Sequence, residues 1–112
     1  MDFFQVFLKN PVSEKIFCYT LNPPEAVKIE PDESCYFVSA PAEAAKLEAG
    51  EYYVTQVRKE DLKNSELLDL AIELQKEALW NRLKLENVLY LRRLFEDNSP
   101  VTQLWRPLII KV

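Results

Sequence analysis

The sequence predicts an α+β fold: an antiparallel sheet of five to six strands with one long amphipathic helix, about residues 65–83, packed on one face. The residues from 65 to 85 form the longest stretch with helical periodicity, and they contain neither Pro nor Gly. Runs rich in aromatic and β-branched residues precede and follow this stretch. The chain has 112 residues, which suits a single globular domain, residues 1–112.

The apolar residues of the predicted helix form two adjacent stripes when they are placed at steps of about 100°. The first stripe consists of Leu67, Leu70, Ala71, Leu74, Ala78 and Leu85. The second stripe consists of Leu68, Ile72, Leu79 and Leu83. Together they are wider than the face of about 100° that one contact with a core requires. Charged residues and Trp80 fill the remaining arc, so we expect a second surface to cover part of the apolar face.

The sequence marks the start of this helix clearly and its end less clearly. We expect Asn64 or Ser65 to cap the first free amides, with Glu66 and Asp69 placed favourably near the positive end of the helix dipole. At the other end, Asn81 and Arg82 would point into the apolar face if the helix continued. We therefore expect the helix to end between residues 81 and 84.

Before the helix, the pattern is one of strands and proline-broken loops. Residues 2–8 and 15–21 predict two strands that pair as an antiparallel hairpin through the intervening loop. A short edge strand is expected at 27–29 and a third strand at 34–39, while residues 41–47 suggest one short helical turn. Gly50, the only glycine, is expected to supply a positive φ before a strand at 52–58.

After the helix, residues 88–95 fit a strand, with a second helix as the alternative. The sequence Asp97-Asn98-Ser99-Pro100 is a turn signal, and residues 101–112 are strongly strand-like. A hairpin across this turn would give both segments a partner. Pro107 is then expected at a sheet edge or a bulge.

The residue types that the chain lacks exclude several chemistries. There is no histidine, one glycine and two cysteines, which excludes His-based nucleophile pairs, phosphate-binding glycine loops, dinucleotide fingerprints and four-cysteine zinc sites. We therefore expect no enzymatic activity, no cofactor and no metal. Glu73 and Glu77 lie one helical turn apart, but we interpret them as an ordinary charged face.

Composition also gives expectations about environment. No segment has the run of about 18 apolar residues that a membrane helix needs, and the first residues do not resemble a secretory signal. We expect a cytoplasmic protein that does not bind membranes, with Cys18 and Cys35 as reduced thiols. The net charge of −4 disfavours nucleic acid as a partner, although residues 82–112 are relatively basic. We interpret these basic residues as partners of acidic ones within the fold or across a dimer.

Polar and aromatic side chains on the predicted strands are the candidate ligand or interface residues. In a regular strand Tyr52, Gln56 and Arg58 share one face, and the Tyr53 face is expected to meet the helix. With residues from the last strand and the outer helix arc, the candidates are Tyr52, Gln56, Arg58, Trp80, Gln103, Trp105 and Arg106. An ordinary solvated sheet face is the alternative interpretation.

The sequence supports two functional hypotheses. The first is a non-enzymatic protein-interaction module that forms a homodimer, because the apolar helix surface is broad and Trp80 suits an interface. The second is a small-molecule, effector-type binding domain with a cleft lined by aromatic, Gln and Arg side chains. Self-association and a further protein partner are both expected under the first hypothesis.

Overall fold

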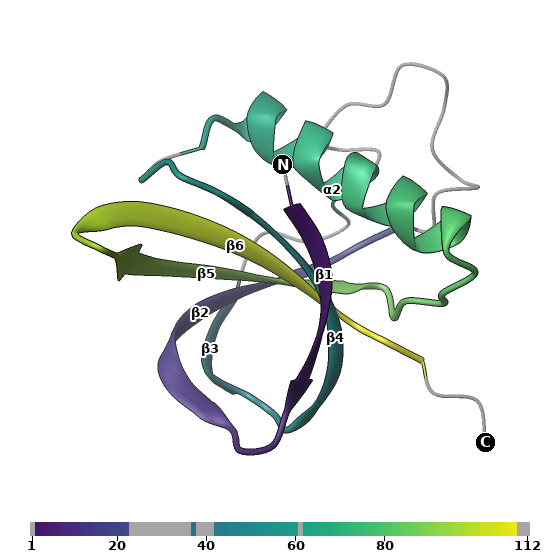
Figure 1. Cartoon of the computed structure of the whole chain (residues 1–112), viewed down its shortest axis with the longest axis horizontal. Coiled ribbons are helices and arrows are strands. Elements are labelled where there is room, and N and C mark those ends of the chain that lie inside the picture. Colours follow the sequence, from purple (N-terminus) through teal and green to yellow (C-terminus); the bar gives the residue numbers. More distant parts are fainter. Residues whose placement is uncertain (1, 23–36, 38–41, 61, 110–112) are drawn as a thin grey trace.

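The computed structural model describes residues 2–22, 37, 42–60 and 62–109. The predicted α+β fold is confirmed, because six strands form one antiparallel sheet and the helix packs on one of its faces (Figure 1). The elements, in chain order, are β1 (Asp2–Leu8), β2 (Val12–Thr20), β3 (Ala42–Leu47), β4 (Gly50–Val57), α2 (Asn64–Trp80), β5 (Val88–Glu96) and β6 (Ser99–Pro107).

The sheet is strongly curled. Its strand order is β1-β4-β6-β5-β2-β3, so β1 and β3 are the two edges. Only residues 9–11 join β1 to β2, and only residues 48 and 49 join β3 to β4, although each pair is separated by several strands in the sheet. Such short links require the two edges to approach each other at one end. Figure 1 shows the result, with β1 to β4 curving round beneath α2.

The predicted hairpin between the first two strands is wrong. β1 pairs with β4, with Phe4 opposite Val54, while β2 pairs with β3 and β5. Pairing with β4 lets β1 contribute to both faces of the curled sheet. Phe3 stacks on Tyr53 at a centroid distance of 6.4 Å on the helix side, and Phe4 packs on the opposite side.

The segment predicted as a short helical turn is also a strand. β3 (Ala42–Leu47) pairs with β2, with Cys18 opposite Ala42 and Val12 opposite Leu47. Leu47 is fully buried, so tertiary packing and pairing override the helical preference of the alanines. The strands predicted at 27–29 and 34–39 lie outside the described residues, except Phe37, which is buried and forms a bridge with Leu21.

The hairpin after the helix is confirmed, and the helical alternative for residues 88–95 is wrong. β5 and β6 pair in register from Tyr90 opposite Trp105 to Glu96 opposite Ser99. The turn has two residues, Asp97 (φ 50°) and Asn98 (φ 63°), as the type I′ turns of hairpins require. The predicted turn residues 99 and 100 belong to β6 instead, and Pro107 is the last residue of that strand.

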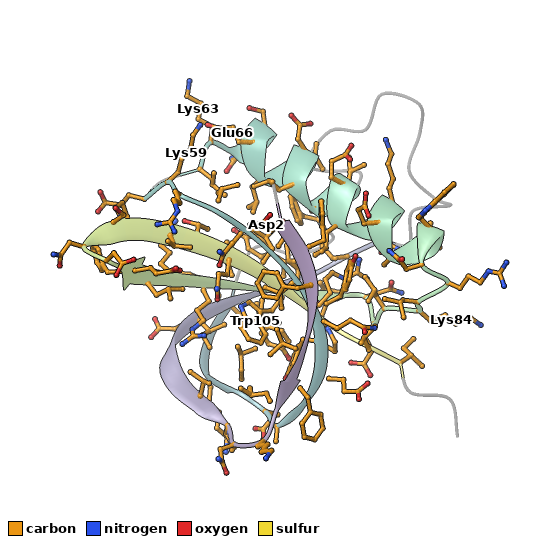
Figure 2. The ribbon with its side chains drawn as sticks, viewed as in Figure 1. Asp2, Lys59, Lys63, Glu66, Lys84 and Trp105 are labelled. Carbon is orange, nitrogen blue, oxygen red and sulfur yellow. The ribbon has the colours of Figure 1, made fainter. Side chains whose placement is uncertain are left out.

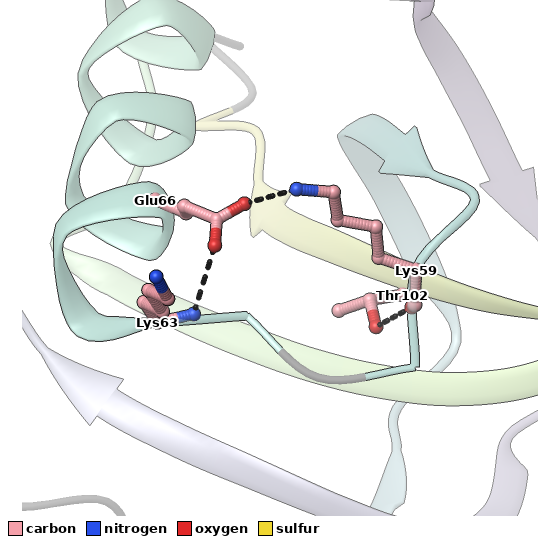
Figure 3. A network of polar contacts seen from close by, with 4 residues as sticks. All are labelled: Lys59, Lys63, Glu66 and Thr102. Atoms are coloured by element: carbon pink, nitrogen blue, oxygen red, sulfur yellow. Dashed lines mark hydrogen bonds and ion pairs between the residues drawn. The ribbon is translucent and has the colours of Figure 1, made fainter.

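The helix starts at residue 64, but its cap differs from the prediction. Lys63 is the N-cap, and neither Asn64 nor Ser65 has that role. The Glu66 carboxylate accepts a hydrogen bond from the Lys63 backbone N–H at 3.4 Å (Figure 3). It also forms an ion pair with Lys59 Nζ at 2.5 Å. Both interactions lower the pKa of Glu66, the bond from Lys59 most. Thr102 Oγ1 donates to the Lys59 carbonyl at 2.7 Å, which ties this connection to β6.

The helix ends at Trp80, three residues before the predicted end at about 83. Asn81 is the C-cap, and Arg82 has the left-handed φ of 59°. The backbone N–H of Arg82 donates to the Leu79 carbonyl at 3.0 Å, and that of Leu83 to the Ala78 carbonyl at 2.8 Å. This is a Schellman motif formed without glycine, which explains why the sequence did not mark the end.

Two apolar cores lie on opposite faces of the sheet. The helix-side core contains α2 residues such as Leu74 and Ala78, with Tyr53, Leu91 and Leu104 of the sheet. The predicted contact of the Tyr53 face with the helix is therefore confirmed. The far-side core takes side chains from all six strands, which the curl brings together: Phe4, Val6, Leu8, Val12, Ile16, Leu47, Tyr52, Val54, Tyr90 and Trp105.

The chain itself covers most of the second helical stripe. Leu68 is buried, and Ile72 and Leu83 are half-buried against the helix-side core. Leu79 remains 53% exposed, and Trp80 remains 85% exposed, at the C-terminal end of the helix. The second surface expected for this stripe is therefore supplied largely by the chain itself, and Leu79 is the member of the stripe that stays exposed.

Gly50 has the predicted positive φ, at 154°. We expect Gly50→Ala to lower the free energy of unfolding by about 1–3 kcal/mol, because an L side chain strains this backbone conformation. A Cβ added there would meet no atom within 4 Å, so the cost comes from the backbone alone. Urea unfolding measures it, with Glu48→Ala on the exposed surface as a control that should change stability by less than about 0.5 kcal/mol. Equal effects of the two substitutions would contradict this account.

Candidate functional site

Four of the predicted site residues come together on the far side of the sheet. Gln56 lies opposite Gln103, and Tyr52 lies two residues before Val54, which is opposite Trp105, so these side chains share one face. Gln103 Nε2 donates to Gln56 Oε1 at 2.9 Å, and Trp105 Nε1 donates to Gln103 Oε1 at 2.9 Å. The Tyr52 hydroxyl donates to the Glu48 carbonyl at 2.6 Å. These bonds already use the main polar atoms of the cluster.

Three of the four residues are buried on the far side of the sheet, and Gln56 is half-buried. Trp105 is 4% exposed and Tyr52 is 5% exposed, and their rings meet edge to face at 5.4 Å. Figure 2 places Trp105 in the middle of the curled sheet. Burial, with smaller effects from Tyr90, Glu48 and Glu86, raises the pKa of Tyr52 to about 12. These side chains are part of a core, and their polar atoms are hydrogen-bonded within the protein, as buried polar groups usually are.

The other three predicted site residues lie elsewhere. Arg106 is on the helix-facing side and is 1% exposed, and its guanidinium donates to Gln75 Oε1 and the Glu86 carbonyl. Arg58 is exposed and lies 3.5 Å from Glu96. Trp80 lies on the outer surface of α2. The seven residues therefore do not form one site.

The structure offers a different candidate, the outer edge of β1. No strand in the described ranges pairs with the outward side of β1, which makes this strand an edge of the sheet. Its only charged residue is Asp2, at its start, and Phe7 is 66% exposed. The opposite edge, β3, carries Glu43 and Lys46 within six residues. Charged side chains protect an edge from pairing, so β1 is the less protected edge.

Two hollows lie beside β1 on its helix-facing side. The first hollow has a volume of about 500 Å³ and is lined by Phe3, Phe4, Gln5, Tyr53, Glu77, Asn81 and Leu83. The second hollow has a volume of about 260 Å³ and is lined by Gln5, Glu51, Arg82, Leu83, Lys84, Leu108 and Ile109. Gln5 and Leu83 line both hollows, so the two are adjacent. Lys84, at the second hollow, lies beyond the C-terminal end of α2 in Figure 2.

The hollows differ in charge. In the first hollow, the Asn81 amide lies 3.5 Å from the Tyr53 hydroxyl, and the Glu77 carboxylate lies nearby. Burial and, to a lesser extent, Glu77 raise the pKa of Tyr53, and the bond from Asn81 lowers it. The second hollow carries Arg82 and Lys84 against Glu51. One hollow is thus acidic and the other has a basic excess.

The sequence did not reveal this site. The aromatic and apolar character of residues 2–8 predicts a strand, but the predicted hairpin places β2 beside β1 and so does not make β1 an edge. The order of strands in the sheet makes β1 an edge, and no local pattern encodes that order.

No family model, curated protein or solved structure matches the chain. Within the described residues, no three Cys, Asp or Glu side chains are grouped as a metal site would require. No helix in the same part of the chain is long and apolar enough to cross a membrane. Cys18 is a half-buried free cysteine whose pKa is raised by burial, and Cys35 lies outside the described residues.

Proposed function

We propose that this protein is a non-enzymatic protein-interaction module that adds an extended polypeptide segment to its sheet along β1. The observation that carries the proposal is an edge strand with one charge in seven residues, flanked by two hollows. In strand addition, backbone hydrogen bonds supply affinity and neighbouring hollows select side chains. The edge and the hollows of β1 provide both parts.

The ligand-binding alternative has less support. Its proposed lining is divided between two faces of the sheet, and Tyr52, Gln103 and Trp105 already hydrogen-bond to other protein atoms. A ligand would have to break these bonds or displace a core. The lack of histidine and of glycine-rich loops also favours a binding role over catalysis.

A peptide tests the proposal directly. The probe has the sequence of residues 2–8, DFFQVFL, with lysines added at both ends for solubility. A matched peptide has Pro in place of Gln, since proline lacks the N–H and does not fit a paired strand. The measurement is hydrogen exchange of the protein, at a concentration where sedimentation shows a monomer.

We expect the first peptide, and not the proline peptide, to slow amide exchange in β1. Exchange in β3, the charged edge, should stay unchanged. The proposal fails if neither peptide alters β1 up to the solubility limit, or if protection appears only at another element.

A further inference from the structure

β1 is an edge strand whose seven residues include one charged side chain, Asp2. Resting on the proposed strand addition, we propose that the segment bound along β1 is β1 of a second copy of this chain, antiparallel to it about a two-fold axis at Gln5. The protein would then be a symmetric homodimer with a continuous sheet of twelve strands, six from each copy.

The register follows from the length and alternation of β1. With the axis at Gln5, Phe3 lies opposite Phe7 of the second copy, Phe4 opposite Val6, and all seven residues are paired. An axis at any other residue of β1 leaves at least two residues of the strand without a partner. An axis between two residues would pair each residue with one whose side chain points to the opposite face of the sheet, because successive side chains of a strand alternate.

This register also covers the exposed aromatic residue of the edge. Phe7 is 66% exposed in the single chain, with Glu51 opposite it on β4. In the dimer it would lie beside Phe3 of the second copy, at the rim of the first hollow. Aromatic cross-strand pairs stabilise antiparallel sheets, so each copy gains two such contacts.

The charges of the hollows favour a second copy over an unrelated segment. The first hollow contains Glu77 and lies toward Phe3, whereas the second contains Arg82 and Lys84 and lies on the other side of Gln5. Rotation about Gln5 places the acidic hollow of each copy toward the basic hollow of the other. Complementary charges of this kind fix register and favour association.

Charge substitutions at the axis test the register, because only a residue on a two-fold axis faces its own copy. The variants are Gln5→Lys and Gln5→Glu, studied separately and as an equal mixture by sedimentation equilibrium. Gln5 is exposed, so both variants should unfold as wild type does. Phe95→Lys and Phe95→Glu are matched controls, because Phe95 is 72% exposed on the hairpin opposite Pro100 and away from β1.

We expect wild type to sediment at twice the chain mass of 13.1 kDa at micromolar concentration. Each Gln5 variant should weaken the dimer about tenfold or more, since like charges lie directly opposite. The mixture should recover wild-type affinity within about threefold, and the Phe95 variants should leave it unchanged.

Three results would overturn the inference: a monomeric wild type, Gln5 variants with wild-type affinity, or a mixture that does not recover. If the chain is monomeric but the peptide still protects β1, strand addition stands and the second copy is not its partner. If the chain dimerises with wild-type affinity in both variants and the peptide leaves β1 unprotected, both proposals fail.

Discussion

Trp105→Ala is expected to lower the free energy of unfolding by about 3–5 kcal/mol, the usual cost of removing a large buried aromatic side chain. Trp105 is 4% exposed in the far-side core, and its ring meets Tyr52 edge to face. The Arg92 guanidinium lies 5.8 Å from the ring centroid. The substitution would leave a cavity on this face. It would also remove the indole N–H that donates a hydrogen bond to Gln103 Oε1.

The second tryptophan provides a matched control. Trp80 is 85% exposed on α2, so Trp80→Ala should change stability by less than about 0.5 kcal/mol. Urea unfolding followed by far-ultraviolet circular dichroism measures both variants without relying on tryptophan fluorescence. A loss below about 1 kcal/mol for Trp105→Ala would indicate that Trp105 lines an open cleft, as the ligand-binding hypothesis holds, and does not fill a core.

Local signals predicted the elements that local chemistry determines. The long apolar periodicity gave the middle of α2, and Asp97-Asn98 between two apolar runs gave the β5–β6 hairpin. The positive φ of Gly50 followed from a lone glycine before a strand. Each of these features depends on residues that are close together in the sequence.

Features that depend on distant residues were not predictable in this way. β1 pairs with β4 across more than forty residues of sequence, and β3 is a strand because β2 lies beside it. The curl of the sheet turns a face with Tyr52, Gln103 and Trp105 into a second core. The alternation of the strands showed which residues share this face, but nothing in it showed that the face is enclosed.

The candidate site illustrates the same limit. Residue type suggested that Trp105 and Gln103 line a ligand or interface site, with a solvated sheet face as the alternative. Neither interpretation describes the pair, because both side chains are buried and hydrogen-bonded to each other. Arg106, next to them in sequence, faces the opposite core because successive side chains of a strand alternate. The edge of β1 became visible only with the strand order.

Arg106→Met is expected to lower the free energy of unfolding by about 2–4 kcal/mol, because it removes the donor to the buried Gln75 side chain and to the partly buried Glu86 carbonyl. Arg106 is 1% exposed, and its Nε donates to the Glu86 carbonyl at 3.1 Å. Its Nη1 donates to Gln75 of α2, so one side chain links the last strand, the helix and the segment after it. Arg106→Lys should recover only part of this loss, because an ammonium group cannot reproduce the planar fork of donors.

The variant Gln75→Met separates the hydrogen bond from the packing. Alone, it should destabilise the protein because it takes an acceptor from the buried guanidinium. Combined with Arg106→Met, it should recover about 1 kcal/mol or more, since the unpaired Gln75 amide is then replaced by an apolar side chain. A double-mutant cycle from urea unfolding gives this coupling energy. Additive losses would show that Arg106 and Gln75 act independently and that the link between α2 and β6 is made by apolar packing.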